Sequence, residues 1–262
     1  MDFSTPYVFD TGQDILGWVR VYEETHNAIY LDAAINAGDW LSSIQQPDGW
    51  FPTTAYSKST HTYHSRVAWA LLRLSEVSQR SIYRDMAILN LNWVVSKQQD
   101  NGWFDISAND EITHLIAYTG RGLLEASVLL GTDDYLQSAR RLADVLLEIQ
   151  LDSGRLYGRY DFRWHPTVEW HCVTGDLQIA IIWLRLYHMT GNEDYHRGAK
   201  SAIVHVTKIQ NIESSEKGIR GGIPGSDPLG GDYCPRQYLS WGTKFYIDAV
   251  HLMLDYCFVL MG

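Results

Sequence analysis

The sequence predicts an all-α fold, an α/α toroid assembled from helical hairpins. A unit recurs four times along the 262 residues: an apolar helix, a short break, a second helix, and a turn that begins with glutamine. The period is roughly 50 residues, which is typical of helical arrays. One hairpin cannot bury its own apolar face, so successive hairpins must stack on one another. No segment shows the alternating pattern of a β-strand.

The first helix of each unit is apolar over most of its circumference, as in residues 67–72 and 179–184. Such a helix is buried on most sides, so we expect these helices to form the inner layer of the toroid. Each begins near a Thr-Gly or His-Ser pair. Five inner helices are predicted, over residues 11–24, 63–77, 114–130, 174–189 and 241–257.

The second helix of each unit is amphipathic. In residues 133–150, Leu142 and Leu146 follow the helical spacing, while Arg140 and Asp144 occupy the opposite face. Such a helix lies outside with one face in water. Four outer helices are predicted, over residues 28–46, 82–99, 133–150 and 193–210.

This arrangement amounts to about four and a half hairpins within a single predicted domain, residues 1–262. The sequence leaves three possibilities open. The ring closes with fewer helices, the ring stays open, or the chain is a shortened relative of larger toroids. A partner chain or a second copy of the chain could complete an open ring. The longer returning loops, rich in Gly, Pro and aromatic residues, are the expected place for function.

Composition excludes several classes of protein. The formal net charge of −10 argues against nucleic-acid binding, which requires a basic face. Residues 1–10 lack the pattern of an export signal, and no apolar run is long enough for membrane insertion. The three cysteines, Cys172, Cys234 and Cys257, are an odd number far apart in sequence, which favours a reducing, cytoplasmic location.

Two motifs carry a resemblance to known families. The turns Gln45–Trp50 and Gln98–Trp103 resemble the Gln…Gly-Trp repeats of terpenoid cyclases and protein prenyltransferases. The Thr-Gly-initiated helices and the Gly-Asn-x-x-Tyr break at 191–195 resemble the six-hairpin glycosidases, uronate lyases and sugar epimerases. The resemblance implies a toroid, which in these families has six or seven hairpins, and it specifies the scaffold more than the reaction.

A polar residue follows the Gly or Ser near each of four inner-helix starts: Gln13, Arg66, Arg121 and Asp176. These residues either face a ligand pocket or form a structural polar layer. Arginine at a helix start opposes the macrodipole and needs another reason, such as an anionic ligand. The candidate catalytic residues are His64, His114, Tyr118 and Asp176; the candidate substrate-binding residues are Arg66, Arg121, Trp170, His171, Gln178, Arg220, Trp241, Lys244 and Tyr246.

This composition indicates an enzyme acting on a carbohydrate that carries carboxylates, since aromatic planes suit sugar faces and arginine binds carboxylates in a bidentate manner. A lyase or epimerase must neutralise the carboxylate and remove an adjacent carbon-bound proton. We expect His64 or His114 as base, Tyr118 as acid or second base, and Arg66 or Arg121 as neutraliser.

Three alternatives remain open. A glycoside hydrolase would use two carboxylates, for which Asp176 and Asp161 are best placed. A non-catalytic toroid would bind a glycan or a partner chain in the same cavity. A terpenoid cyclase or prenyltransferase-like protein shares the turns, but the acidic Asp-x-Asp-Asp and Asp-Asp-x-x-Asp motifs are absent.

No cofactor and no metal site is predicted. His171, Cys172 and Cys234 could form a zinc cluster, and Asp232-Tyr233-Cys234 with the distant His251 has a prenyltransferase-like order. The ligand spacing matches no compact zinc motif.

Overall fold

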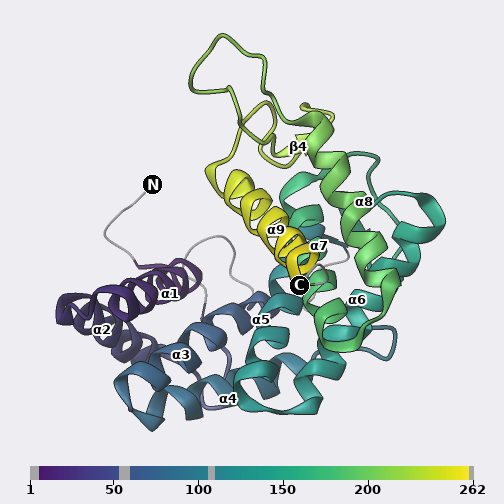
Figure 1. Ribbon diagram of the computed structural model, residues 1–262. Helices are drawn as coiled ribbons and strands as arrows, with labels where there is room; N and C mark the ends of the chain where they lie inside the picture. Colours follow the sequence, from purple (N-terminus) through teal and green to yellow (C-terminus); the bar gives the residue numbers. More distant parts are fainter. Residues whose placement is uncertain (1–5, 53–59, 106–109, 260–262) are drawn as a thin grey trace. The chain divides into compact units, whose positions relative to one another are not determined.

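The computed structural model describes residues 6–52, 60–105 and 110–259, the last five of these by their backbone alone. Within these residues the chain forms nine α-helices, one short 3-10 helix and four short strands (Figure 1). The predicted all-α class is confirmed. No helix in the described ranges is long and apolar enough to cross a lipid bilayer.

All nine predicted helices are present. The first helices of the hairpins are α1 (Val8–Thr25), α3 (Ser65–Ser78), α5 (Thr113–Leu130), α7 (Val173–Thr190) and α9 (Ser240–Val259), and a 3-10 turn η1 (Thr62–His64) precedes α3. The second helices are α2 (Ala28–Ile44), α4 (Ser81–Val95), α6 (Asp133–Ser153) and α8 (Glu193–Ile209).

The contacts between residues group the chain into two compact units, which we describe separately. The first unit comprises Met1–Ala108 and Tyr118–Ala139, and the second comprises Asn109–Ala117 and Arg140–Gly262. In the first unit α3 packs against α1 and α4; in the second α7 packs against α8 and α9. The expectation of a single domain stays a prediction.

Helix α7 is the core of the second unit. Its residues from Val173 to Leu184 are all buried, as its apolar circumference predicts. Trp183 is fully buried, and its indole Nε1 donates a hydrogen bond to the Ala143 carbonyl of α6 at 3.0 Å. A tryptophan buried in this way stabilises the hairpin by apolar burial while its N–H remains satisfied.

The recurring glutamines hold the turns that follow the second helices. The Gln45 side-chain amide donates to the carbonyls of Gly49 and Met86, and Gln98 donates to those of Gly102 and Ser138. Each glutamine therefore links its own turn to the next second helix. The predicted helix over 82–99 ends earlier, at Val95, because the chain already turns at this point.

Two of the three Thr-Gly pairs expected at helix starts lie inside helices, which corrects their assignment, whereas Thr174-Gly175 does lie in the first turn of α7. Thr11-Gly12 lies inside α1 and Thr119-Gly120 lies in the middle of α5. A Cβ added at Gly12 would lie 3.0 Å from Val67 of α3, and one added at Gly122 would lie 2.3 Å from the Ser65 carbonyl carbon. A residue without a side chain allows the backbones to approach this closely.

The strands correct the prediction that β structure is absent. β1 (Asp110–Ile112) pairs antiparallel with β2 (Arg159–Asp161), and β3 (His171–Cys172) pairs antiparallel with β4 (Ser226–Asp227). All four belong to loops of the second unit. Strands of two or three residues are too short to show a two-residue hydrophobic period in the sequence.

Candidate functional site

In the first unit, Arg66 is fixed at the first turn of α3. It is 5% exposed, and its Nε and Nη2 donate to Oε1 of Gln13 on α1 at 3.2 and 2.8 Å. The guanidinium lies over the rings of Tyr118 and Trp69, 4.8 and 5.4 Å from their centroids. The two hydrogen bonds to one Gln13 oxygen and the two rings set the plane of this cation.

Arg121 lies over the same tryptophan but has an acidic partner. Its guanidinium is 5.5 Å from the centroid of Trp69, and its Nε is 2.7 Å from Oε1 of Glu125. Arg121 also lies in the middle of α5, so the argument from the helix macrodipole does not apply to it. Glu125 balances the charge of Arg121, and the orientation of the Arg66 guanidinium by Gln13 and the two rings makes Arg66 a candidate for an anionic ligand.

Aromatic side chains surround Tyr118 and the start of α3. Phe9 contacts both Tyr63 and Tyr118, with ring centroids 5.4 and 4.7 Å apart. His61 stacks on Tyr63 at 4.4 Å. The first unit thus brings together Arg66, Tyr118 and a histidine, His61, that the sequence reasoning did not single out.

His64 is deeply buried among these rings. Its side chain is 1% exposed and packs against Phe51 and Tyr63. Burial, and then the neighbouring His61, lower its pKa to about 3. A side chain so enclosed is better suited to packing than to direct contact with a substrate, and its catalytic role stays a prediction.

The buried His64 predicts a loss of stability in acid. Between pH 6.5 and 3 the unfolded chain protonates this histidine and the folded chain does not, so stability falls as pH falls. Going from pH 7 to pH 5 should cost about 2 kcal/mol from this residue alone. In urea unfolding at both pH values, His64→Gln should lose less stability than the wild type by this amount. Equal acid sensitivity of the two proteins would contradict this account of His64.

In the second unit, His171 and Asp176 form a buried pair at the start of α7. His171 Nδ1 lies 3.0 Å from Oδ2 of Asp176, whose side chain is 3% exposed. Since a carboxylate accepts, Nδ1 carries a proton, and in the neutral ring Nε2 presents a lone pair. The other carboxylate oxygen, Oδ1, is buried without a hydrogen bond.

His114 and Gln178 form a second pair in the same unit. The Gln178 amide donates to the Thr174 carbonyl and contacts His114 Nδ1 at 2.8 Å. Which of the two side chains donates depends on the tautomer of the His114 ring. The catalytic role of His114 stays a prediction.

Two further residues that sequence reasoning missed lie at His171. His205 of α8 stacks on His171 with ring centroids 4.4 Å apart, and its Nε2 is 3.1 Å from Oδ2 of Asp227. Burial, and then His171, lower the pKa of His205. No sequence signal singles out His205, since it resembles any polar residue of an amphipathic helix, and only the β3–β4 pairing places Asp227 beside it.

The remaining binding candidates make other contacts. On α9, Lys244 pairs with Asp248, Tyr246 contacts Thr207 through its hydroxyl at 2.9 Å, and Trp241 donates to the Tyr233 hydroxyl at 3.0 Å. Arg220 is exposed, and the Trp170 carbonyl accepts from Gly158. Their roles in substrate binding stay predictions.

The zinc cluster of His171, Cys172 and Cys234 considered from the sequence stays a hypothesis. Burial raises the pKa of the fully buried Cys172 thiol far above its usual range, and burial also raises that of Cys234. Burial therefore favours the neutral thiol at both positions.

Among the described residues, each unit contains a pocket. A cavity of about 80 Å³ in the second unit is lined by His171, Asp176, His205, Arg155 and Gln150, among others. A wider pocket of about 630 Å³ in the first unit lies at the glutamine turns, beside Trp50, Trp93 and Lys97. Of these two pockets, the small cavity is the one lined by candidate catalytic or substrate-binding residues, namely His171 and Asp176.

Comparison with known proteins identifies the fold. No protein-family model and no curated protein sequence matches the chain. Solved structures do. A D-mannose isomerase is similar with a TM-score of 0.78 and 15% identity, over 95% of this chain and 71% of that chain.

Two other neighbours act on different sugars. An unsaturated glucuronyl hydrolase from a Bacillus species, described as responsible for glycosaminoglycan degradation, has a TM-score of 0.71 and 17% identity, over 93% of this chain and 73% of that one. A cellobiose 2-epimerase from Bacillus thermoamylovorans has a TM-score of 0.73 and 12% identity, over 94% and 71%.

These likenesses establish the class of fold. The chain has the fold of the six-hairpin glycosidase-like enzymes, as the Thr-Gly helices and the Gly-Asn-x-x-Tyr break suggested. The terpenoid cyclase resemblance has no counterpart among the three neighbours described. At these identities the comparison supports the scaffold and leaves the reaction to the side chains.

Proposed function

We propose that this chain is a carbohydrate-active enzyme acting on a uronate-containing saccharide, as a lyase or epimerase. The observation that carries the proposal is the fixed guanidinium of Arg66, held by Gln13 between Tyr118 and Trp69. The fold supports it, since the neighbours include a cellobiose 2-epimerase and an unsaturated glucuronyl hydrolase.

Arg66 supplies recognition of the carboxylate. A planar guanidinium in a set orientation suits bidentate contact with a carboxylate, and the contact strengthens as the group gains charge. Removal of the proton on the adjacent carbon places that charge on the carboxylate. The cation therefore stabilises the transition state more than the ground state, which is the requirement for catalysis.

Tyr118 supplies proton transfer beside this cation. Its ring is flanked by Phe9 and the Arg66 guanidinium, so the side chain is held where the carboxylate would bind. In elimination the carbon-bound proton leaves and the glycosidic oxygen departs from the neighbouring carbon; in epimerisation a proton returns to the opposite face. His61, whose pKa is lowered by burial, is neutral near pH 7 and is the candidate base.

Hydrolysis has less support from the carboxylates. Asp161 accepts backbone hydrogen bonds from Arg163 and His165 of its own turn, and Asp176 is engaged with His171. Each residue therefore already has a structural use. Location in the cytoplasm and completion of the ring by a partner chain remain expectations.

A substrate panel tests the proposal. The purified chain is incubated with uronate-containing polysaccharides and oligosaccharides, and with neutral saccharides of the same linkage as matched controls. Ultraviolet absorbance detects unsaturated uronate, and chromatography detects released or epimerised sugars. Turnover restricted to the uronate members is expected. Turnover of the neutral members at equal rates would contradict recognition of a carboxylate.

A further inference from the structure

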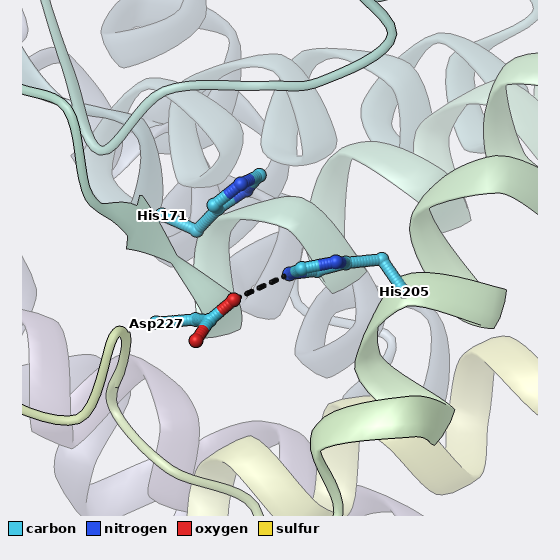
Figure 2. Close-up of side chains that lie close together, drawn as sticks. All are labelled: His171, His205 and Asp227. Atoms are coloured by element: carbon cyan, nitrogen blue, oxygen red, sulfur yellow. Dashed lines mark ion pairs between the residues drawn. The ribbon is translucent and has the colours of Figure 1, made fainter.

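We propose that His171, His205 and Asp227 form a binding site for one divalent transition metal ion of the zinc class. The three side chains come from β3, α8 and β4 of the second unit (Figure 2). This assignment does not depend on the proposed function. It also differs from the cysteine cluster considered from the sequence.

The β3–β4 pairing creates two of the ligands. His171 and Asp227 are direct partners in the antiparallel register, so their side chains project to the same face of this short ribbon. His205 reaches the same point from α8, and Figure 2 shows its ring beneath that of His171 with its nitrogen directed at the Asp227 carboxylate. Strands β3 and β4 and helix α8 thus each contribute one side chain to the same cluster.

The distances fit a site that closes slightly around an ion. One donor atom from each of the three residues lies within 4.8 Å of the other two. Bonds of about 2.0–2.1 Å in a tetrahedral site place donor atoms roughly 3.3 Å apart. His205 Nε2 and Asp227 Oδ2 are already 3.1 Å apart, and both side chains are 32% exposed, so they have room to adjust.

The hydrogen bonds around the two imidazoles leave nitrogen atoms available to a metal. Asp176 accepts from Nδ1 of His171, which leaves the Nε2 lone pair of His171 directed away from this carboxylate. His205 Nε2 is buried and makes no hydrogen bond of good geometry, although it faces Asp227. A histidine whose second nitrogen is held by a carboxylate is the usual outer-shell arrangement of zinc ligands.

The surroundings suit a cation with one open position. Two imidazoles and one carboxylate are the ligand type of zinc sites that keep a water as fourth ligand. The adjoining cavity of about 80 Å³ has room for water, at about 30 Å³ for each molecule. The carboxylates of Asp176 and Asp227 balance a divalent charge. Among the residues that line the cavity, Arg155 is the one with a permanent positive charge.

Metal titration tests the site directly. The whole purified chain is dialysed against a chelator and titrated with Zn²⁺ by calorimetry, and with Co²⁺ by visible absorption. We expect one Zn²⁺ per chain with a sub-micromolar Kd, and a Co²⁺ spectrum typical of four or five ligands. His205→Gln and Asp227→Asn should each lower the affinity by at least about 100-fold, and Asp176→Asn by about 10- to 100-fold.

Matched controls separate this cluster from ordinary surface groups. His165, which pairs with Asp161 at 3.4 Å outside the cluster, and the exposed His251 are replaced by glutamine. Both variants should bind Zn²⁺ as the wild type does. Circular dichroism checks folding, and if Asp227→Asn unfolds, His205→Gln decides. Absence of stoichiometric binding to the folded wild type, or binding unchanged in both ligand variants, overturns the proposal.

Discussion

Replacing Arg66 by methionine should lower kcat/KM on a uronate saccharide by about 100-fold, which corresponds to about 2.7 kcal/mol of transition-state stabilisation. The loss reflects a charge-assisted, bidentate contact that methionine cannot make, although it fills much of the same space. Arg66→Lys should restore only part of the activity, because a point charge does not reproduce the planar contact. Steady-state rates with the substrate found in the panel check this prediction.

Two other arginines serve as comparisons. Arg73→Met removes a cation from the same helix that is paired with Glu23 and Glu76, and we expect unchanged rates. Arg121→Met should cost less than Arg66→Met, since Glu125 already engages its charge. An Arg66 variant that keeps full kcat/KM while Arg121→Met loses it would reverse the roles assigned to the two residues.

Replacing Gly122 by alanine should destabilise the chain by about 3 kcal/mol, in the upper range for overpacking. The added Cβ would lie 2.3 Å from the carbonyl carbon of Ser65 and 2.5 Å from the backbone nitrogen of Arg66. Backbone atoms cannot move aside as the end of a flexible side chain can. In a chain of this size the melting temperature should fall by roughly 6–12 °C.

Gly17 of α1 is the matched control. A Cβ added there meets no atom within 4 Å, so Gly17→Ala should stabilise the helix by about 0.5–1 kcal/mol. Thermal and urea unfolding of both variants measure the contrast. Equal effects of the two substitutions would show that α3 and α5 do not approach as closely as the structure indicates.

The fold was predictable because the hydrophobic pattern of each helix extends over many residues. Each apolar or amphipathic helix spans several turns, so the period in the sequence is unambiguous, and all nine helices were located. Thr11-Gly12 and Thr119-Gly120 were misread, because a glycine inside a helix and a glycine at a helix start look alike in a sequence, whereas Thr174-Gly175 does lie at the start of α7. The strands at 171–172 and 226–227 were missed because two residues carry no period.

The candidate site was only partly predictable for a physical reason. Arg66 was found because an arginine at a helix start is unfavourable and stands out. The pairings Arg66–Gln13 and Arg121–Glu125, which distinguish the two arginines, depend on side-chain geometry. His205 and Asp227 meet only through tertiary structure, 22 positions apart in sequence numbering. Spacing rules for metal ligands describe compact motifs and do not detect such a pair.

The most direct test of the proposed function is proton exchange in deuterated water. The wild-type chain is incubated with uronate oligosaccharides, and nuclear magnetic resonance follows the proton on the carbon that bears the carboxylate. Both elimination and epimerisation remove this proton, so its signal should disappear with the wild type and persist with Arg66→Met. Product formation by the wild type with this proton retained would contradict the account and indicate a reaction at another position, such as hydrolysis.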